Sequence, residues 1–375
     1  MFELTREQEM LRAMAREFAD RELSAKALEL DRKGEFPYDI VKKMADLGFL
    51  GISTARELGG SAMGHLAGTI VIEELARVYP SAGFFLEVGT GPVYAVANFG
   101  SEEQKKKYLP PVLKGEKHMC IAATEPTGGS ELNNLGTEAV LTDDGYVING
   151  RKVYITGGGV ADYCLLLAKT GEKASLIMVD RGAPGFTIGR RQDQMGLKTV
   201  DVSEFAFNDC RVPEDNLIGK EGSGFPIAMT IFTVARPAIG AVGLGIACGA
   251  FEIALKYAKE RILYGKPIAR LQAVQFLLAE MDTEIDAARW LVYAPGAALD
   301  SGVSPRDVVK KASRAKAVGA EVALSVTRKA VEILGGNGVS PEYHLVRLMS
   351  DAMELLPASG TQQIMKIIQA GEILK

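Results

Sequence analysis

Residue types that commonly bind metals or form disulfides are scarce in this sequence. The 375 residues include four cysteines, three histidines and one tryptophan. The cysteines stand far apart, without the short spacing of a metal site, at positions 120, 164, 210 and 248. We therefore expect no metal, and we expect reduced, mostly buried thiols, which favours a cytoplasmic protein.

An excess of one charge is also missing. Lysine and arginine together number 43, and aspartate and glutamate number 47, which gives a net charge of −4. Without a basic face we expect no nucleic-acid partner. The longest uncharged apolar run, residues 237–251, is shorter than the roughly 20 residues that cross a bilayer. Residues 1–20 have neither a basic start nor an apolar stretch, so we expect neither membrane insertion nor a secretory signal.

The first third of the sequence has a helical period. Thr5 and Gln8 form a capping-box pair, and apolar residues follow on one face. The same period predicts further helices over residues 38–47, 64–79, 92–98 and 102–109. Pro110 and Pro111 are expected to end the last of these helices, because proline has no N–H donor.

The pattern changes near residue 117 to short β-branched or aromatic runs separated by turn residues. Asp143, Asp144 and Gly145 predict a hairpin turn. Strands are predicted over residues 136–141, 146–148, 152–156, 163–168, 174–179, 186–188 and 204–207. Because no helices separate these strands, they favour an antiparallel sheet or barrel over a βαβ fold.

From residue 222 the helical period returns in long segments. These are residues 225–263, 272–299, 305–334 and 343–355, with a last short segment after Ser359. Long helices joined by short loops are typical of a bundle. The fold class is therefore α+β, with an N-terminal helical domain (1–116), a middle antiparallel β domain (117–221) and a C-terminal four-helix bundle (222–375). A basic run in the bundle, Lys310, Lys311, Arg314 and Lys316, is interpreted as a solvated helix face.

Three short motifs occur in this framework. Residues 124–130 read Thr-Glu-Pro-Thr-Gly-Gly-Ser, residues 147–156 read Val-Ile-Asn-Gly-Arg-Lys-Val-Tyr-Ile-Thr, and residues 334–338 read Leu-Gly-Gly-Asn-Gly. Together with the order of helices, sheet and bundle, they resemble the acyl-CoA dehydrogenase family along nearly the whole chain. The resemblance implies FAD as cofactor, an acyl-CoA substrate and an electron-transfer flavoprotein or similar acceptor. It also implies a homodimer or tetramer, because the family builds its FAD site from two chains.

The residue types at these positions suit a flavin dinucleotide. Tyr154 offers an aromatic face, and Thr124 and Thr156 can form hydrogen bonds with the ring edge. Arg261 and a glycine-rich turn suit the phosphates. The resemblance implies FAD contacts from Ile121, Ala123, Thr124, Ser130, Tyr154, Ile155, Thr156, Arg261, Leu263, Gln272, Glu332, Gly335, Gly336, Thr361 and Gln363, with Glu332 in place of a common glutamine. It implies substrate contacts from Thr90, Ser130, Thr233, Arg236 and Gly360.

The chain departs from the family at the catalytic carboxylate. Most members carry a Tyr-Glu-Gly-Thr segment whose glutamate removes the α proton of the thioester. Here residues 357–361 read Pro-Ala-Ser-Gly-Thr, so Ser359 occupies that place. A second known position, just before Arg236, holds Ala235. Loss of a general base typically lowers a rate by about 10²–10⁴-fold, so another group is needed for oxidation.

Glu87 is the candidate for a relocated base. It follows Phe84, Phe85 and Leu86, and a carboxyl group in an apolar pocket has a raised pKa and can act as a base. The alternative is a solvated glutamate or one paired with a buried arginine. A base at this position would approach the acyl chain away from Cα. That suits a cyclic α,β-unsaturated acyl-CoA, such as a cyclohexene-carboxyl thioester, which would become a conjugated diene. The Ser359 amide could still donate a hydrogen bond to the thioester oxygen.

Two further functions stay open. The first keeps the fold without dehydrogenation, as an acyl-CoA lyase, desulfinase or reductase. The second is a catalytically silent flavoprotein that binds acyl-CoA.

Overall fold

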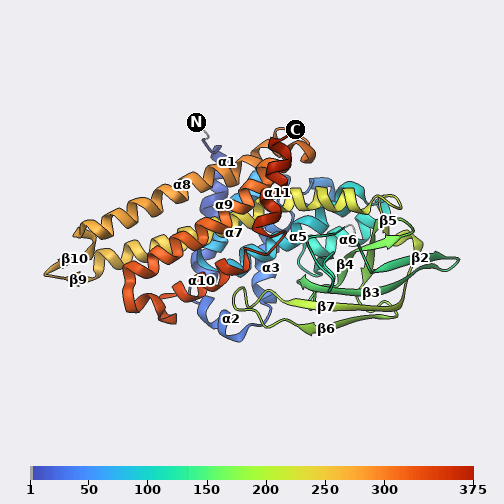
Figure 1. Cartoon of the computed structure of the whole chain (residues 1–375), viewed down its shortest axis with the longest axis horizontal. Helices are drawn as coiled ribbons and strands as arrows, with labels where there is room; N and C mark the ends of the chain where they lie inside the picture. Colours follow the sequence, from blue (N-terminus) through green and yellow to red (C-terminus); the bar gives the residue numbers. More distant parts are fainter. Residues whose placement is uncertain (1–2, 133) are drawn as a thin grey trace.

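Capping residues and apolar periodicity define the helices of the first part of the chain. The computed structural model describes residues 3–132 and 134–375 (Figure 1). The Thr5 side chain accepts a hydrogen bond from Gln8 N, and the Gln8 side chain accepts one from Thr5 N, which confirms the capping box. The α-helices of this part are α1 (Arg6–Phe18), α2 (Ala27–Lys33), α3 (Tyr38–Asp46), α4 (His65–Val78), α5 (Pro80–Phe99) and α6 (Glu102–Leu113). Single turns lie between them at η1 (Ala19–Leu23), η2 (Phe49–Gly51) and η3 (Arg56–Leu58).

Two of these helices, α5 and α6, continue past an internal proline. α5 starts at Pro80 and contains Pro92, so the prediction that began at residue 92 missed its first half. The expectation that Pro110 ends α6 is wrong, because the helix continues to Leu113. A proline loses only its own N–H donor, and Pro110 O still accepts a hydrogen bond from Lys114 N at 3.1 Å. Burial of Val112 and Leu113 in the core stabilises this last turn.

The middle of the chain forms a mixed, mainly antiparallel sheet. Its strands are β1 (Met119–Ala122), β2 (Glu138–Thr142), β3 (Gly145–Thr156), β4 (Tyr163–Thr170), β5 (Lys173–Asp180), β6 (Phe186–Arg191), β7 (Val202–Val212) and β8 (Leu217–Ile218), with η4 (Glu214–Asn216) before β8. Their order is β6-β7-β3-β2-β4-β5-β8, with β1 beside β4. Thr142 pairs with Gly145, which confirms the hairpin.

Two pairings depart from the antiparallel expectation. β4 runs parallel to β1 and, through one residue pair, parallel to β2. Parallel neighbours need a crossover connection of about a dozen or more residues. Residues 123–162, which include the β2–β3 hairpin, provide that connection between β1 and β4. Strand spacing alone did not reveal this, and the prediction also missed the short strand β1.

A bulge in β3 turns one aromatic side chain outward. The predicted strands at residues 146–148 and 152–156 are one strand, whose register with β7 shifts between Lys152 and Ile155. Tyr154 lies in this shift with a φ of 56°. Bulges change the direction of side chains next to functional sites. Here Tyr154 is 66% exposed, whereas Lys152 and Ile155 are buried.

The last part of the chain is a helix bundle, as predicted. Its helices are α7 (Gly224–Glu260), α8 (Gln272–Asp300), α9 (Pro305–Leu334), α10 (Leu345–Glu354) and α11 (Gln362–Ile373). Shorter elements join them at β9 (Ile262–Leu263), β10 (Lys266–Pro267), η5 (Ile268–Arg270), η6 (Gly335–Val339) and η7 (Pro341–Tyr343). α7, α8 and α9 pack along one another and α11 packs on α9 (Figure 1).

α7 is the central helix of the bundle. It is long and apolar enough to cross a membrane, but 72% of its most apolar window is buried inside the structure, as in the core helix of a globular fold. Small residues allow α9 to approach it closely. A β-carbon on Gly243 would lie 2.1 Å from Gly319 O, and one on Gly319 would lie 2.3 Å from Gly240 O. These contacts therefore require glycine.

The N-terminal and C-terminal helices share one hydrophobic core. α4 packs on both α7 and α8, and Asp300 at the end of α8 accepts hydrogen bonds from His65 N (2.6 Å) and Leu66 N (3.0 Å) at the start of α4. α5 belongs to two cores. Leu86 lies in the core between the helical parts, and Val93 lies in the core between α5, α6, α7 and the sheet. The middle of α5 is therefore fixed from both sides.

The requirement for glycine at position 243 can be tested by measuring unfolding. Gly243→Ala should lower the free energy of unfolding by about 1–3 kcal/mol, because the added methyl group overpacks the contact with α9. The matched control is Gly371→Ala on the exposed face of α11, where a β-carbon meets nothing within 4 Å. This control should stabilise the protein by up to about 1 kcal/mol through helix propensity. Thermal unfolding of both variants is the measurement, and equal melting temperatures would contradict the packing argument.

Candidate active site

Glu87 is a buried carboxyl group with one hydrogen-bond partner among the described residues. It lies on α5 and is 6% exposed. Its Oε1 accepts a hydrogen bond from Ser359 Oγ at 3.3 Å. Burial raises the pKa of Glu87 to about 8, although the Ser359 hydrogen bond lowers it in part. Neither alternative from the sequence is found, since the side chain is not solvated and has no ion pair among residues 3–132 and 134–375.

Ser359 lies in the tight connection between α10 and α11. Ser359 and Gly360 both have left-handed backbone conformations, with φ of 50° and 104°. This conformation brings the hydroxyl group of Ser359 to Glu87. The Ser359 N–H donates no hydrogen bond within the part of the chain that the structure describes. The amide therefore keeps an unused hydrogen-bond donor, which the sequence-based hypothesis for the thioester oxygen requires.

Lys316 contacts the same connection and was missed by the sequence analysis. The interpretation of its basic run as solvated is wrong for this residue, which is 0% exposed. Its ammonium group donates hydrogen bonds to Gly360 O (2.7 Å) and Leu356 O (2.9 Å). Burial, together with nearby Arg236, lowers the pKa of Lys316 to about 8. The available signal was spacing, because position 316 continues the buried series Val308, Ala312, Ala320 at intervals of four.

The second sequence motif ends beside α5. A β-carbon on Gly157, at the end of β3, would lie 3.5 Å from Val88 Cγ1 and 4.0 Å from Cys120 Cβ. The segment that contains Tyr154, Ile155 and Thr156 therefore ends next to the residue that follows Glu87. Ile121 lies in β1, next to Cys120, and Ala123 directly follows the strand.

A buried ion pair holds the 124–130 turn against β3. Lys152 Nζ donates to Glu125 Oε1 (2.8 Å) and to Ala123 O (3.1 Å). The Glu125 carboxylate also accepts hydrogen bonds from Gly136 N and Thr137 N. Burial alone would raise the pKa of Glu125, but these donors hold it below its usual value. Thr124 O accepts a hydrogen bond from Val153 N at 3.0 Å, so the turn has a fixed position beside Tyr154.

The remaining predicted cofactor residues lie elsewhere. Figure 1 shows β9 and β10 at the far end of the long helices, away from the middle sheet. Arg261, Leu263 and Gln272 are at this end, and Glu332, Gly335 and Gly336 follow at the end of α9. Glu332 forms an ion pair with Arg328, which offsets the added charge. One chain therefore does not bring these residues together with Tyr154.

Thr361 and Gln363 begin α11. The Thr361 hydroxyl caps this helix by accepting a hydrogen bond from Ile364 N at 3.2 Å. Gln363 is exposed and Ser130 is exposed, so both side chains are accessible to a ligand.

The predicted substrate residues differ in what they can offer. The hydroxyls of Thr90 and Thr233 donate to backbone carbonyls of their own helices, Leu86 O (2.9 Å) and Met229 O (2.8 Å). Arg236 is 6% exposed, and its Nε has no partner among the described residues. Burial lowers the pKa of this guanidinium to about 10. A buried cation in this state favours an anionic partner.

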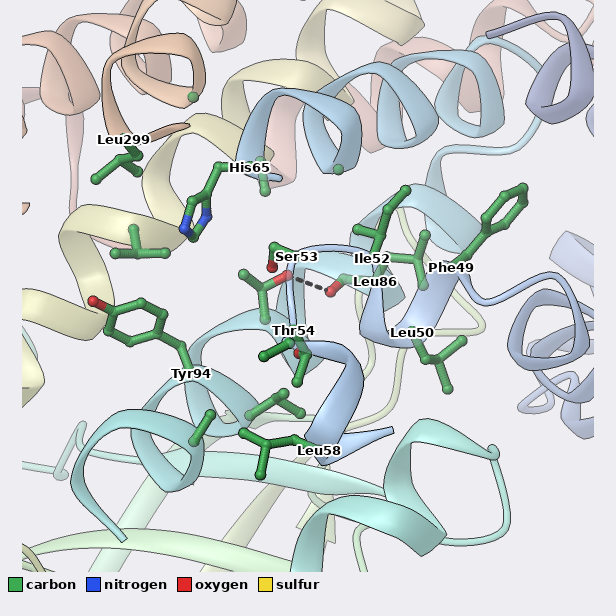
Figure 2. A pocket seen from close by; sticks show the side chains of 18 of the residues that line it. Phe49, Leu50, Ile52, Ser53, Thr54, Leu58, His65, Leu86, Tyr94 and Leu299 are labelled. Atoms are coloured by element: carbon green, nitrogen blue, oxygen red, sulfur yellow. Dashed lines mark hydrogen bonds between the residues drawn. The ribbon is translucent and has the colours of Figure 1, made fainter. Parts of the chain in front are cut away.

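A cavity of ≈ 490 Å³ lies on the neighbouring face of α5 (Figure 2). Its lining includes Leu86 and Thr90 of α5 and Pro237 of α7. Figure 2 shows His65 and Tyr94 on one side of this space and Leu50 on the other. Glu87 is not part of the lining. The cavity thus borders the same helix as the carboxyl group without containing it. The described residues also hold no cluster of three or more His, Cys, Asp or Glu that could bind a metal ion.

Family models match all three parts of the chain. Residues 5–116 match the acyl-CoA dehydrogenase N-terminal domain, residues 120–210 the middle domain and residues 222–374 the C-terminal domain. The chain belongs to the acyl-CoA dehydrogenase family. It is therefore an oxidoreductase that acts on CH–CH groups, and its fold is the expected one of helical, β and helical parts.

Individual relatives align over nearly the full length of this acyl-CoA dehydrogenase. The short-chain specific acyl-CoA dehydrogenase of Clostridium acetobutylicum is 41% identical, and the alignment covers 100% of both chains. The caffeyl-CoA reductase-Etf complex subunit CarC of Acetobacterium woodii is 37% identical over 98% of both. The solved structure of butyryl-CoA dehydrogenase from Megasphaera elsdenii has a TM-score of 0.96 and 34% identity, covering 100% of both chains.

FAD is the cofactor of this acyl-CoA dehydrogenase, and the residues present fit it. The exposed ring of Tyr154 offers a face to an isoalloxazine. Glycines leave open space for a backbone approach, because a β-carbon on Gly335 or Gly336 would meet no atom within 4 Å. Arg261 is exposed, and its guanidinium forms no ion pair with any residue that the structure describes.

The raised pKa of Glu87 predicts a pH-dependent stability. The ordinary pKa is 4.5 and the folded one about 8, so between these values the folded protein holds a proton that the unfolded chain has released. Rising pH then favours unfolding, by up to about 1.4 kcal/mol per pH unit. Wild-type protein should lose stability relative to Glu87→Gln as the pH rises from about 5 to about 8. Urea unfolding across this range is the measurement, and a constant difference would mean an ordinary pKa.

Proposed function

We propose that this enzyme oxidises a cyclic or α,β-unsaturated acyl-CoA and that Glu87 is its general base. The observation that carries the proposal is the contact between Glu87 and Ser359, deep in the protein. Ser359 occupies the family's carboxylate position, and an unassisted hydroxyl is too weak a base for carbon acids. Glu87 is the carboxyl group that reaches it within the described chain. The carboxylate function has, in this proposal, moved from the α10–α11 connection to α5.

Position and pKa together define what Glu87 can do. The Glu87 carboxyl group comes from α5 and contacts the hydroxyl group of Ser359, not its backbone. In our proposal the Ser359 N–H binds the thioester oxygen, so Cα lies near position 359 and Glu87 meets a carbon further along the acyl group. In an α,β-unsaturated thioester the γ proton is acidified by conjugation. Transfer of that proton to the Glu87 carboxylate generates an extended enolate, which the Ser359 N–H stabilises.

Bound FAD would supply the hydride acceptor, so that loss of one proton to Glu87 and of one hydride from the acyl group would yield a conjugated diene. We propose the FAD contacts named from the sequence, with Tyr154, Thr124 and Thr156 at the ring. We also propose an electron-transfer flavoprotein as redox partner. Support for this partner comes from the relative that is named as a subunit of a reductase-Etf complex.

A reductase acting on the same site is the second candidate. Its support is the pKa of about 8, because Glu87 is then mainly protonated at neutral pH and can donate a proton to an enoyl thioester. The relative named caffeyl-CoA reductase agrees with this direction, and the short-chain relative with the dehydrogenase. Glu87 can donate or remove a proton in the same geometry, so the direction of the reaction depends on the redox partner.

The relocated base is tested by anaerobic reduction of the bound flavin. Glu87→Gln should slow bleaching by a cyclohexene-carboxyl-CoA at least about 100-fold, because the base is lost while the size is kept. For wild type, the rate should rise with pH and level off above about 8, since the ionised form is the base. Glu103→Gln on the exposed surface of α6 is the control and should not change the rate.

A double variant sharpens this test. Glu87→Gln combined with Ser359→Glu returns the carboxylate to the family position and should favour oxidation of a saturated short-chain acyl-CoA. An unchanged rate in Glu87→Gln would end the proposal. A flavin that no thioester reduces in the wild-type protein would instead indicate a silent flavoprotein.

We further propose a homo-oligomer whose FAD sites each combine two chains. The support is the separation of the two sets of FAD residues at different ends of one chain (Figure 1). α7 alone is roughly 55 Å long, which exceeds the length of one flavin dinucleotide. The exposed apolar residues Ile262, Leu263 and Tyr264 near Arg261 are available for contact with a second copy. We also propose a cytoplasmic location and domain boundaries at residues 116/117 and 221/222.

Mixed oligomers test the shared site. Tyr154→Asp and Arg261→Ala should each lose FAD when purified alone, because each removes one half of every site. Refolding the two variants together should restore part of the FAD content, since mixed oligomers contain one intact site. Light scattering should show a dimer or tetramer. A monomer with full FAD content would contradict the proposal.

A further inference from the structure

The connection from α10 to α11 has little hydrogen bonding of its own. Leu355 N and Leu356 N still donate to α10, and the next regular contact is the Thr361 cap of α11. Between them, the backbone N–H groups of residues 358–361 form no hydrogen bond within the described chain. Two successive residues in this stretch, Ser359 and Gly360, are left-handed. Such a segment needs outside contacts to keep one conformation.

Lys316 provides these contacts. Its ammonium group donates to Gly360 O at 2.7 Å and to Leu356 O at 2.9 Å, one residue on each side of the Pro357–Ser359 stretch. A third contact reaches Gln362 Oε1 at 3.4 Å. The three acceptors surround a side chain that is 0% exposed. One cation on α9 therefore fixes both ends of the segment.

Lys316 has no carboxylate within salt-bridge distance among the described residues. Gln362 in turn donates to Ala317 O (3.0 Å) and Glu321 Oε1 (3.0 Å) on α9. The backbone carbonyls are thus the main partners of a buried charge. Charge-assisted hydrogen bonds of this kind are stronger than neutral ones.

We propose that Lys316 is a positioning residue that holds Ser359 against Glu87. In this role it contacts no substrate atom. It fixes the backbone at Leu356 and Gly360, so that the Ser359 hydroxyl reaches Glu87 and the Ser359 N–H keeps a defined direction. The inference rests on the proposed function, because the positioned groups are the proposed base and the proposed thioester donor. The conformation of the segment can be measured independently of that function.

Substitution of Lys316 tests the proposal with two readouts. Lys316→Met removes the donors at similar size, and Lys316→Arg keeps the charge and several donors. Within the peptide that covers residues 355–362, exchange of the Leu355 and Leu356 amides, which donate to α10, should be at least tenfold faster in Lys316→Met, because release of the segment loosens these bonds. The kcat for flavin reduction should fall at least tenfold with smaller change in KM. Lys316→Arg should restore part of both.

The matched control is Lys311→Met, an exposed lysine on the same helix. It should change neither exchange nor kcat. Unchanged exchange and unchanged kcat in Lys316→Met would overturn the proposal. Where Lys316→Met fails to fold, Lys316→Gln, which keeps a shorter donor, carries the same comparison. Faster exchange in the Lys316 variants together with an unaffected Glu87→Gln would uphold the clamp and reject Glu87 as base, so the two failures are distinguishable.

Discussion

Burial of one carboxyl group is the constraint on which this site depends. Glu87 loses the solvation of water and gains one weak hydrogen bond from Ser359 in return. This imbalance keeps the carboxyl group protonated up to about pH 8. Two hydrophobic cores hold this part of α5 in place. Leu86, beside Glu87, belongs to the core between the helical parts, and Val93 belongs to the core at the sheet.

Two buried lysines use their charge to fix segments that lack regular structure. Lys152 binds Ala123 O and Glu125 and holds the turn beside Tyr154. Lys316 binds Leu356 O and Gly360 O and holds the segment with Ser359. In both cases an ammonium group from a regular element satisfies carbonyls of an irregular one. Functional residues often lie on loops that a rigid scaffold positions. Here lysine side chains from β3 and α9 hold two such loops in place.

The fold itself could be predicted in large part from local patterns. The capping box of Thr5 and Gln8, the hairpin at residues 142–145 and the limits of α8 and α9 depend on near neighbours, and the structure confirms them. Errors occurred where distant contacts outweigh local preference. α6 continues through Pro110 because Val112 and Leu113 are buried. The parallel pairing of β1 with β4 depends on strands that are far apart in sequence.

For the site, the sequence by itself determined the family, the cofactor type and the absence of a carboxylate at position 359. These follow from residue identity in motifs. Only the tertiary structure decided that Glu87 is buried against Ser359 and that Lys316 is inside, because burial depends on which helices pack together. Lys316 lies between two alanines, and its spacing from Ala312 and Ala320 places it on the buried face of the helix without showing which groups it meets there. Helix α9 lies between α7, α8 and the last connection, and that packing turns position 316 inward.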